Sequence, residues 1–335
     1  MSETRSNIPS VIERTRAIAT DAPAVAVHFV GDMAGFVLGE AALLLVVRDG
    51  LTRSIAVHDG AILCSVAAPD RIITGGDDGK VVATDAQGVS TVLAQDVKHR
   101  WIDHIAIGRA GALAWSAGKQ AFARTGKDGE HAIDVASTVG GLAFAPKGLR
   151  LAIAHYNGVT LWFPDLQADP NELEWRGSHR DAMFSPDGRF VVSSMQEPTL
   201  HGWRLADRKD MRMSGYAARV RSFAFTADEK WLATSGSNQL ILWPFQGKDG
   251  PMGKTPRILA PAESQAEIIA CHPKQGIVAV GYADGLVLLV RMDDGAEILA
   301  RKPAGVPVTA LAWNATGSKL AIAAEDGQAG VLDLA

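Results

Sequence analysis

The sequence has few features of a disulfide-stabilised, exported or membrane-spanning protein. Only two of its 335 residues are cysteines, and Cys64 and Cys271 each lie in an apolar run, where a thiol usually packs as a small hydrophobic group. This usage is typical of a reducing compartment, and we expect the protein in the cytoplasm. No apolar run reaches the ~18 residues that span a bilayer, and residues 1–16 lack the apolar segment of a secretory signal.

An excess of basic residues is also missing. The chain has 33 Lys and Arg against 37 Asp and Glu, giving a formal net charge of −4. Nucleic-acid-binding domains usually carry a basic face, so we predict no nucleic-acid partner. Cys-x-x-Cys, His-Glu-x-x-His and nucleophile-elbow motifs are absent from the sequence as well. We therefore predict a protein that is not an enzyme and needs no cofactor.

What the sequence does contain is a pattern that recurs about every forty residues. It begins with an aromatic–small–Pro–x–Gly turn, which reads FAPKG at residues 144–148 and FSPDG at residues 184–188. In three units a tryptophan follows eighteen or nineteen residues after the opening aromatic, at Trp162, Trp203 and Trp243. A fixed period of this size indicates one supersecondary unit used many times.

Each unit contains three strand-length apolar runs, and a fourth, more polar run precedes the next unit. Asp-Gly or Asn-Gly pairs separate the second and third runs, and such pairs favour hairpin turns. Four antiparallel strands per unit form the blade of a β-propeller. We predict an all-β, single propeller of eight blades, with seven as the alternative. The eight predicted first strands begin near Val25, Ile62, Ile105, Leu142, Ala182, Ser222, Ile268 and Ala310.

The two ends of the sequence predict how the ring closes. The last unit stops after its third strand, and Thr15–Ala19 (TRAIA) closely resembles Thr52–Ala56 (TRSIA), the outer strand of the first unit. Residues 12–20 are therefore predicted to pair in the final blade, which would remove an exposed sheet edge. We assign residues 11–335 to the propeller and residues 1–10 to a disordered or loosely attached tail.

Together these features resemble the WD40-repeat family over about residues 12–335. The resemblance depends on the turn at 184–188, the Leu-Ala-Thr-Ser strand at 232–235 and the tryptophan that closes the third strand. The sequence departs from the family because no tryptophan is followed by aspartate. The resemblance implies a non-catalytic scaffold that binds another protein or a peptide. It also implies a buried hydrogen-bonded chain of His179, Ser193 and Trp203 in the fifth unit.

A partner-binding face is predicted on one rim of the ring, where the fourth-to-first connections meet the second-to-third turns. Tyrosine, tryptophan and arginine are enriched at binding hot spots, since they combine large contact areas with polar groups. An arrangement of isolated surface residues is the alternative explanation. The candidates on this rim are Arg100, Trp101, Tyr156, Arg180, Arg219, Arg221 and Tyr282.

Two further functions stay open at this level. The innermost strands carry His28 and His104, with His272 as a third candidate, and imidazoles that converge in the channel would bind a metal or a small ligand, with or without catalysis. Separate polar residues along a wet channel explain the same pattern. The other function is a structural subunit whose rim serves a larger assembly, although we expect a monomer.

Overall fold

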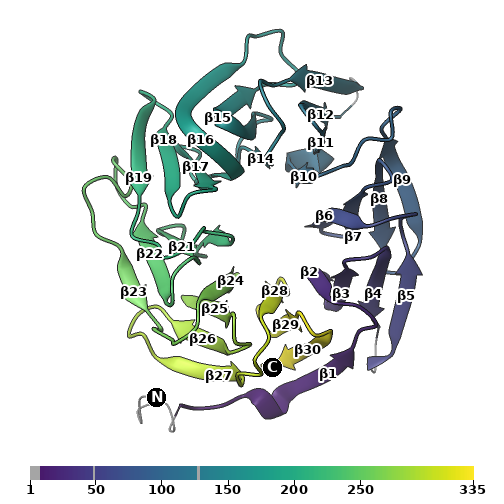
Figure 1. The fold of residues 1–335 in the computed structure, drawn as a ribbon, viewed down its shortest axis with the longest axis vertical. Helices are drawn as coiled ribbons and strands as arrows, with labels where there is room; N and C mark the ends of the chain where they lie inside the picture. The colour runs from purple at the N-terminus through teal and green to yellow at the C-terminus, as the bar shows by residue number, and fades with distance from the viewer. Residues whose placement is uncertain (1–7, 48–49, 127–128) are drawn as a thin grey trace.

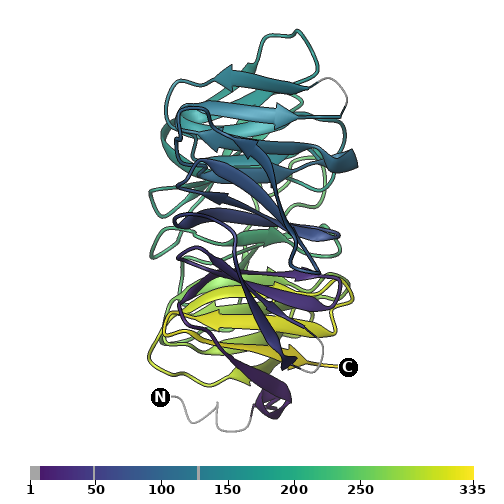
Figure 2. The ribbon, with the colours of Figure 1, turned by 90° about the vertical axis from the view of Figure 1, so that its right-hand side faces the viewer.

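The computed structural model describes residues 8–47, 50–126 and 129–335, and its strands form a ring of small antiparallel sheets around a central channel (Figure 1). Seen edge-on, the ring is a flat disk (Figure 2). Val-, Ile-, Leu- and Ala-rich runs form the strands, and Asp-Gly turns connect several of them. Gly285, for example, has a φ of 90°, which glycine adopts without strain. The predicted all-β antiparallel propeller is confirmed.

Six of the sheets have four strands, and five of these follow the chain from the centre of the ring to its perimeter. The first consists of β2 (Ala24–Val30), β3 (Met33–Leu38), β4 (Ala42–Val46) and β5 (Thr52–Ala56). The second consists of β6 (Ile62–Ala68), β7 (Arg71–Gly76), β8 (Lys80–Asp85) and β9 (Ser90–Gln95). The third consists of β10 (His104–Ile107), β11 (Leu113–Ala117), β12 (Gln120–Arg124) and β13 (Glu130–Asp134).

Two later sheets repeat this arrangement. One consists of β20 (Phe223–Phe225), β21 (Trp231–Thr234), β22 (Leu240–Pro244) and β23 (Arg257–Leu259). The next consists of β24 (Ala266–Cys271), β25 (Ile277–Tyr282), β26 (Val287–Arg291) and β27 (Glu297–Arg301). The described residues also contain two short 3-10 helices, η2 (Ile12–Arg14) before the first strand and η4 (Arg109–Gly111) between β10 and β11.

The prediction of eight separate blades is wrong, because the described residues form seven hydrogen-bonded sheets. The units predicted to begin at Leu142 and Ala182 share one six-stranded sheet. Its long strand β16 pairs with β15 through its first half and with β17 through its second half. The repeat pattern does not reveal that the outer strand of one unit continues into the inner strand of the next. The strands are β14 (Gly141–Phe144), β15 (Leu151–Trp162), β16 (Asn171–Phe184), β17 (Phe190–Met195), β18 (Leu200–Arg204) and β19 (Lys209–Met213).

The last sheet joins the two ends of the sequence, as predicted. It contains β28 (Val308–Trp313), β29 (Lys319–Ala324), β30 (Gln328–Asp333) and β1 (Thr15–Ala19). Strand β1 lies antiparallel to β30, with Thr15 opposite Leu332 and Ala19 opposite Gln328 (Figure 1). Just before it, Pro9 accepts a 2.8 Å hydrogen bond from the backbone of Leu299 in β27. Residues 1–7 of the predicted tail lie outside the described residues, so its boundary stays a prediction.

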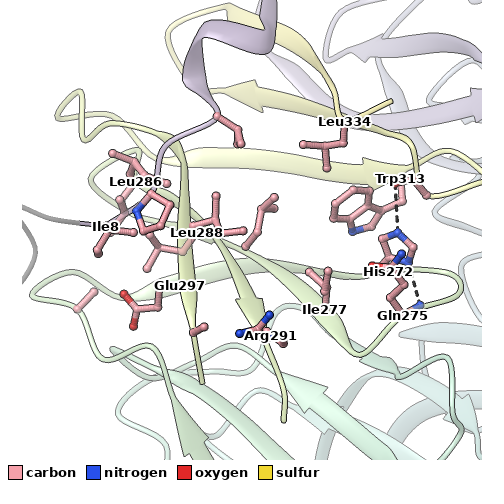
Figure 3. Close-up of a pocket in the computed structure, with 18 of the residues that line it drawn as sticks. Ile8, His272, Gln275, Ile277, Leu286, Leu288, Arg291, Glu297, Trp313 and Leu334 are labelled. Carbon is pink, nitrogen blue, oxygen red and sulfur yellow. Dashed lines mark hydrogen bonds between the residues drawn. The ribbon is translucent and has the colours of Figure 1, made fainter. Parts of the chain in front are cut away.

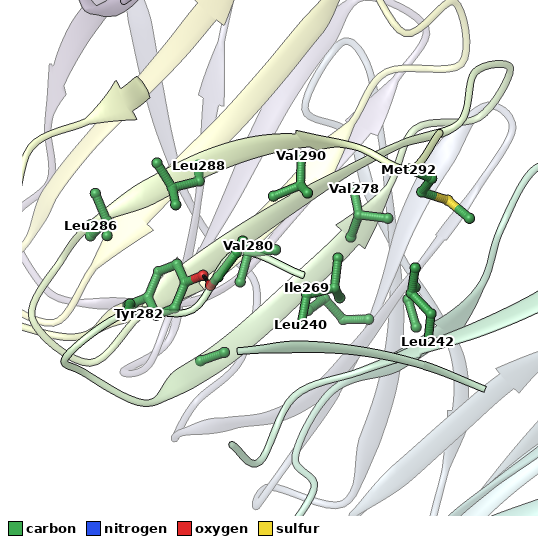
Figure 4. Close-up of a cluster of buried hydrophobic side chains, with 14 residues drawn as sticks. Leu240, Leu242, Ile269, Val278, Val280, Tyr282, Leu286, Leu288, Val290 and Met292 are labelled. Atoms are coloured by element: carbon green, nitrogen blue, oxygen red, sulfur yellow. Dashed lines mark hydrogen bonds between the residues drawn. The ribbon is translucent and has the colours of Figure 1, made fainter. Parts of the chain in front are cut away.

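Hydrophobic clusters fill the spaces between neighbouring sheets. The cluster in Figure 4 lies between β22 and the β24–β27 sheet, and it includes Leu240, Val280 and Tyr282, all fully buried. Because each sheet packs against a neighbour on both sides, its middle strands are buried on both faces: β17 is buried at every position. This packing holds the loops at the edges of the ring in fixed positions.

Candidate loop face and perimeter groove

One edge of the ring, here called the loop face, is formed by the fourth-to-first connections and the second-to-third turns. Antiparallel pairing places these two sets at the same ends of the strands. The loop after β9 illustrates their contact, since Asp96 N donates to Gly79 O at 2.8 Å and Ile102 N donates to Gly76 O at 3.1 Å. Gly76 and Gly79 flank the second-to-third turn of the same sheet, so each loop is anchored to a neighbouring turn.

Trp101 is presented to solvent by a loop that Arg100 and Asp96 hold in place. The Arg100 guanidinium lies 2.6 Å from an Asp96 carboxylate oxygen, and Arg100 N donates to the same carboxylate at 2.9 Å. The Arg100 guanidinium keeps the pKa of buried Asp96 below its ordinary value. The indole of Trp101 is 61% exposed. Arg100 thus holds this loop in position through Asp96, and the exposed Trp101 side chain is accessible to a partner.

The two tyrosines predicted for this face have different environments. Tyr156 is 53% exposed, and its backbone N donates to Ser137 Oγ at 2.8 Å. Tyr282 is fully buried and donates its hydroxyl to Ala260 O at 2.6 Å (Figure 4). The prediction that Tyr282 contacts a partner is therefore wrong. The hydrogen-bond register of β15 with β16 shifts between Tyr156 and Gly158, beside the exposed Tyr156.

Three arginines lie where the loop face meets the inner strands. Arg180 is exposed, and within the described ranges its side chain has no hydrogen-bond or ion-pair partner. Arg219 is half-buried, and its pKa is lowered by burial and by the nearby charges of Arg180 and Arg221. The Nε atom of Arg219 is buried without a hydrogen-bond partner in the described structure. Arg221 Nε lies 3.8 Å from a Glu267 carboxylate oxygen.

Of the two hydrogen bonds predicted in the buried chain of the fifth unit, the one between His179 and Ser193 is present. His179 Nδ1 lies 2.7 Å from Ser193 Oγ, and His179 Nε2 donates to Trp175 O at 2.9 Å. No hydrogen bond joins Ser193 to Trp203 among the described residues. The Trp203 indole instead packs against the imidazoles of His179 and His201, at centroid distances of 5.6 and 4.7 Å.

A similar chain in the next sheet was not predicted. Trp243 Nε1 donates to Tyr216 Oη at 2.7 Å, and Tyr216 Oη lies 2.9 Å from Thr234 Oγ1. Tyr216 takes the role that the family resemblance assigns to histidine. The signal in the sequence was the tryptophan, but no histidine precedes it at the expected place.

The channel histidines are engaged separately. His28 Nε2 lies 2.8 Å from Ser65 Oγ, and burial lowers the pKa of His28 and of His104 to about 4. His272 lies in a turn, where Nε2 donates to Gly317 O at 3.1 Å. In the described ranges, no group of three or more His, Cys, Asp or Glu side chains could hold a metal ion. The two free cysteines have thiol pKa values raised by burial, to about 12 for Cys271.

A second hollow lies on the perimeter of the ring, away from the channel. It is a groove of about 1540 Å³ beside the β24–β27 sheet, and Ile8, Pro9 and Val11 line part of it (Figure 3). Leu288 and Ile277 give it an apolar wall, and the Trp313 and His272 rings lie together at one end. Its walls come from segments far apart in the sequence, so no local pattern signals it.

Comparison with known proteins identifies the repeat. A family model described as "WD domain, G-beta repeat" matches residues 209–244, and one described as "Anaphase-promoting complex subunit 4 WD40 domain" matches residues 267–335. Telomerase protein component 1 of Rattus norvegicus is 29% identical over 197 residues, covering 56% of this chain. The chain spans 7% of the length of that protein.

Among solved structures, the crystal structure of the computationally designed Ika8 protein is similar in fold. Its TM-score is 0.77 at 17% sequence identity, covering 94% of this chain and 97% of the designed one. In the described part of the chain, no helix has the length and apolar character needed to cross a membrane.

Proposed function

Because the chain is a WD40-repeat β-propeller, we propose that it is a non-catalytic scaffold that holds a protein or peptide partner on its loop face. The observation that carries this proposal is the pair of exposed aromatic side chains, Trp101 and Tyr156. Tyr156 N donates to Ser137 Oγ in the neighbouring loop. Ile102 N, next to Trp101, donates to Gly76 O at the neighbouring turn. Aromatic side chains supply large contact areas at low entropic cost, and anchored loops need little further ordering on binding.

The names of the similar proteins agree with this proposal. One matching family model belongs to a subunit of the anaphase-promoting complex, and the rat relative is named as a component of telomerase. Both names describe members of larger assemblies. By analogy we propose that this chain too contacts other proteins, as a monomer in the cytoplasm and without binding nucleic acid. Arg180, Arg219 and Arg221 provide the polar part of the same surface, and Arg100 positions Trp101.

The experiment is a pull-down from native cytosol with the wild type and a Trp101→Ala/Tyr156→Ala variant. The matched control is Val89→Ala/Leu166→Ala, since both residues are well exposed but lie in third-to-fourth connections at the opposite edge. We expect the first variant to lose partners that the wild type and the control retain. Recovery of every partner by the first variant, or equal losses in both, would contradict the proposed face.

A further inference from the structure

The three arginines of the loop face form a cluster across two sheets. Arg180 lies in β16, whereas Arg219 and Arg221 lie in the loop that leads to β20. All three precede or begin an inner-strand segment at the loop face of two neighbouring sheets, and the pKa of Arg219 is lowered by burial and by the charges of the other two. Residues 180, 219 and 221 are called the arginine cluster below.

The carboxylates near the arginine cluster do not neutralise its positive charge. Glu267 is 3.8 Å from Arg221 Nε, which is too long for a hydrogen bond. Asp181 acts on Arg219 from a distance, and its carboxylate instead accepts a 2.8 Å hydrogen bond from Ala182 N. Neither Glu267 nor Asp181 therefore forms a hydrogen-bonded pair with these guanidinium groups in the described residues.

Arginines elsewhere on the surface have close partners. Arg204 makes two hydrogen bonds to Asp207, Arg291 makes two to Asp294, and Arg189 contacts Asp187 at 2.6 Å. Several arginines of the described surface are thus neutralised by a nearby aspartate. The arginine cluster is different, because it keeps cations close together without such partners.

The buried Nε of Arg219 lacks a hydrogen-bond acceptor in the described structure. A buried donor without an acceptor costs about 1–3 kcal/mol, and more when it is charged. A carboxylate from a partner would offset the repulsion by pairing with the exposed Arg180 and Arg221 side chains, since guanidinium and carboxylate groups match in geometry as well as charge.

The arginine cluster lies on the same loop face as the proposed aromatic contact. His104 follows Trp101 by three residues, and Arg180 contributes to the lowered pKa of His104. Because both lie on the loop face, an extended bound segment would contact Trp101 and the cluster together. The whole protein has a net charge of −4, so any attraction for anions is confined to this patch.

We infer that the arginine cluster recognises aspartate or glutamate side chains of an acidic peptide segment in the partner. This inference depends on the proposed function of the loop face, and it specifies the chemistry of what binds there. The acidic residues would pair with Arg180 and Arg221, and neighbouring residues of the segment would contact the aromatic side chains.

The test selects a displayed library of random 12-residue peptides against the full chain. We expect the selected peptides to be enriched in Asp and Glu compared with the unselected library. A synthetic selected peptide should then bind Arg180→Gln/Arg219→Gln/Arg221→Gln at least about tenfold more weakly, because each lost ion pair weakens a complex substantially. Binding should also weaken as salt is raised.

The control variant is Arg71→Gln/Arg189→Gln/Arg291→Gln, which changes the net charge equally but alters the opposite edge. It should retain wild-type binding. Circular dichroism checks that both triple variants fold, and the exposed single variant Arg180→Gln repeats the measurement if the first does not. A phosphorylated peptide and a single-stranded oligonucleotide of equal charge are measured alongside.

The outcomes separate this inference from the proposed function. Peptides that need Trp101 and Tyr156 but carry no acidic excess, and bind the cluster variant normally, overturn the inference alone. Cluster-dependent binding of only the phosphorylated peptide or the oligonucleotide also overturns it, in favour of phosphate recognition. If no peptide binds the wild type, the inference is contradicted, whereas the proposed function is decided by the pull-down.

Discussion

Several buried polar side chains in the described structure are satisfied in short chains that link a loop to the strands of one sheet. His58 shows the arrangement, with its imidazole between Thr74 Oγ1 at 2.8 Å and Asp78 Oδ1 at 2.9 Å. Tyr216 does the same for Trp243 and Thr234. Such contacts fix side chains because an unpaired buried group would be costly. Such hydrogen bonds explain most of the polar residues in the core, which therefore need no catalytic role to account for their burial.

Replacing Tyr216 by Phe should destabilise the protein by about 1–3 kcal/mol, because Trp243 Nε1 would lose its acceptor while staying buried. The measurement is the midpoint of urea unfolding. Tyr156→Phe is the matched control, since that side chain is exposed, and it should change the midpoint little. An equal effect of the two substitutions would show that the buried hydroxyl is not a structural contact.

Acid should weaken the fold partly through His28. Burial lowers the pKa of His28 to about 4, while in the unfolded chain it titrates near 6.5. The unfolded state therefore takes up this proton first as the pH falls, and stability is lost between about pH 6.5 and 4. The expected loss is about 1.4 kcal/mol per pH unit. His28→Gln should flatten the wild-type dependence of unfolding free energy on pH over that interval, and identical curves would refute this assignment.

At the scale of elements, the sheets are joined to their neighbours as well as packed against them. Ile269 N in β24 donates to Ser222 Oγ at 3.1 Å, and Thr309 Oγ1 in β28 donates to Ala24 O in β2 at 2.6 Å. The second contact crosses the junction between the first and last sheets. Strand β1 crosses the same junction, and Ile18 packs with residues of both sheets in one core cluster.

The pairing of β1 with β30 depends on Gly330. A Cβ atom there would lie 2.8 Å from Thr15 Cγ2 and 3.1 Å from Arg16 O. Gly330→Ala should therefore displace β1 and destabilise the protein by about 1–3 kcal/mol. Gly276→Ala is the control, because only Met292 Cβ, at 3.9 Å, lies near that position. Adding Thr15→Ser to Gly330→Ala removes one clash and should recover part of the melting temperature; no loss with Gly330→Ala alone would contradict the close pairing.

The sequence predicted the ring better than it predicted the surface. The repeat and the similarity of residues 15–19 to 52–56 are local signals, and they located the inner strands and the closure. The continuity of β16 and the burial of Tyr282 depend on hydrogen-bond register and on packing by other sheets. The perimeter groove and the arginine cluster bring together distant segments, and no short pattern encodes such proximity.

At the scale of the whole molecule, ring closure is what would hold the loop face rigid for the proposed binding. Seven sheets in a ring support one another on both sides, so each loop is fixed by its own sheet and by the next. An unfastened last sheet would expose the edge of β30 and loosen its neighbours. The proposed scaffold function therefore depends on β1 staying paired in the folded protein.

Hydrogen exchange of the backbone amides in Thr15–Ala19, followed by mass spectrometry on the full chain, tests this dependence most directly. The closed ring predicts that β1 is protected to the same degree as β30, with exchange only when the whole propeller opens. Exchange of β1 at the rate of an unstructured segment, while β30 and β29 stay protected, would contradict it.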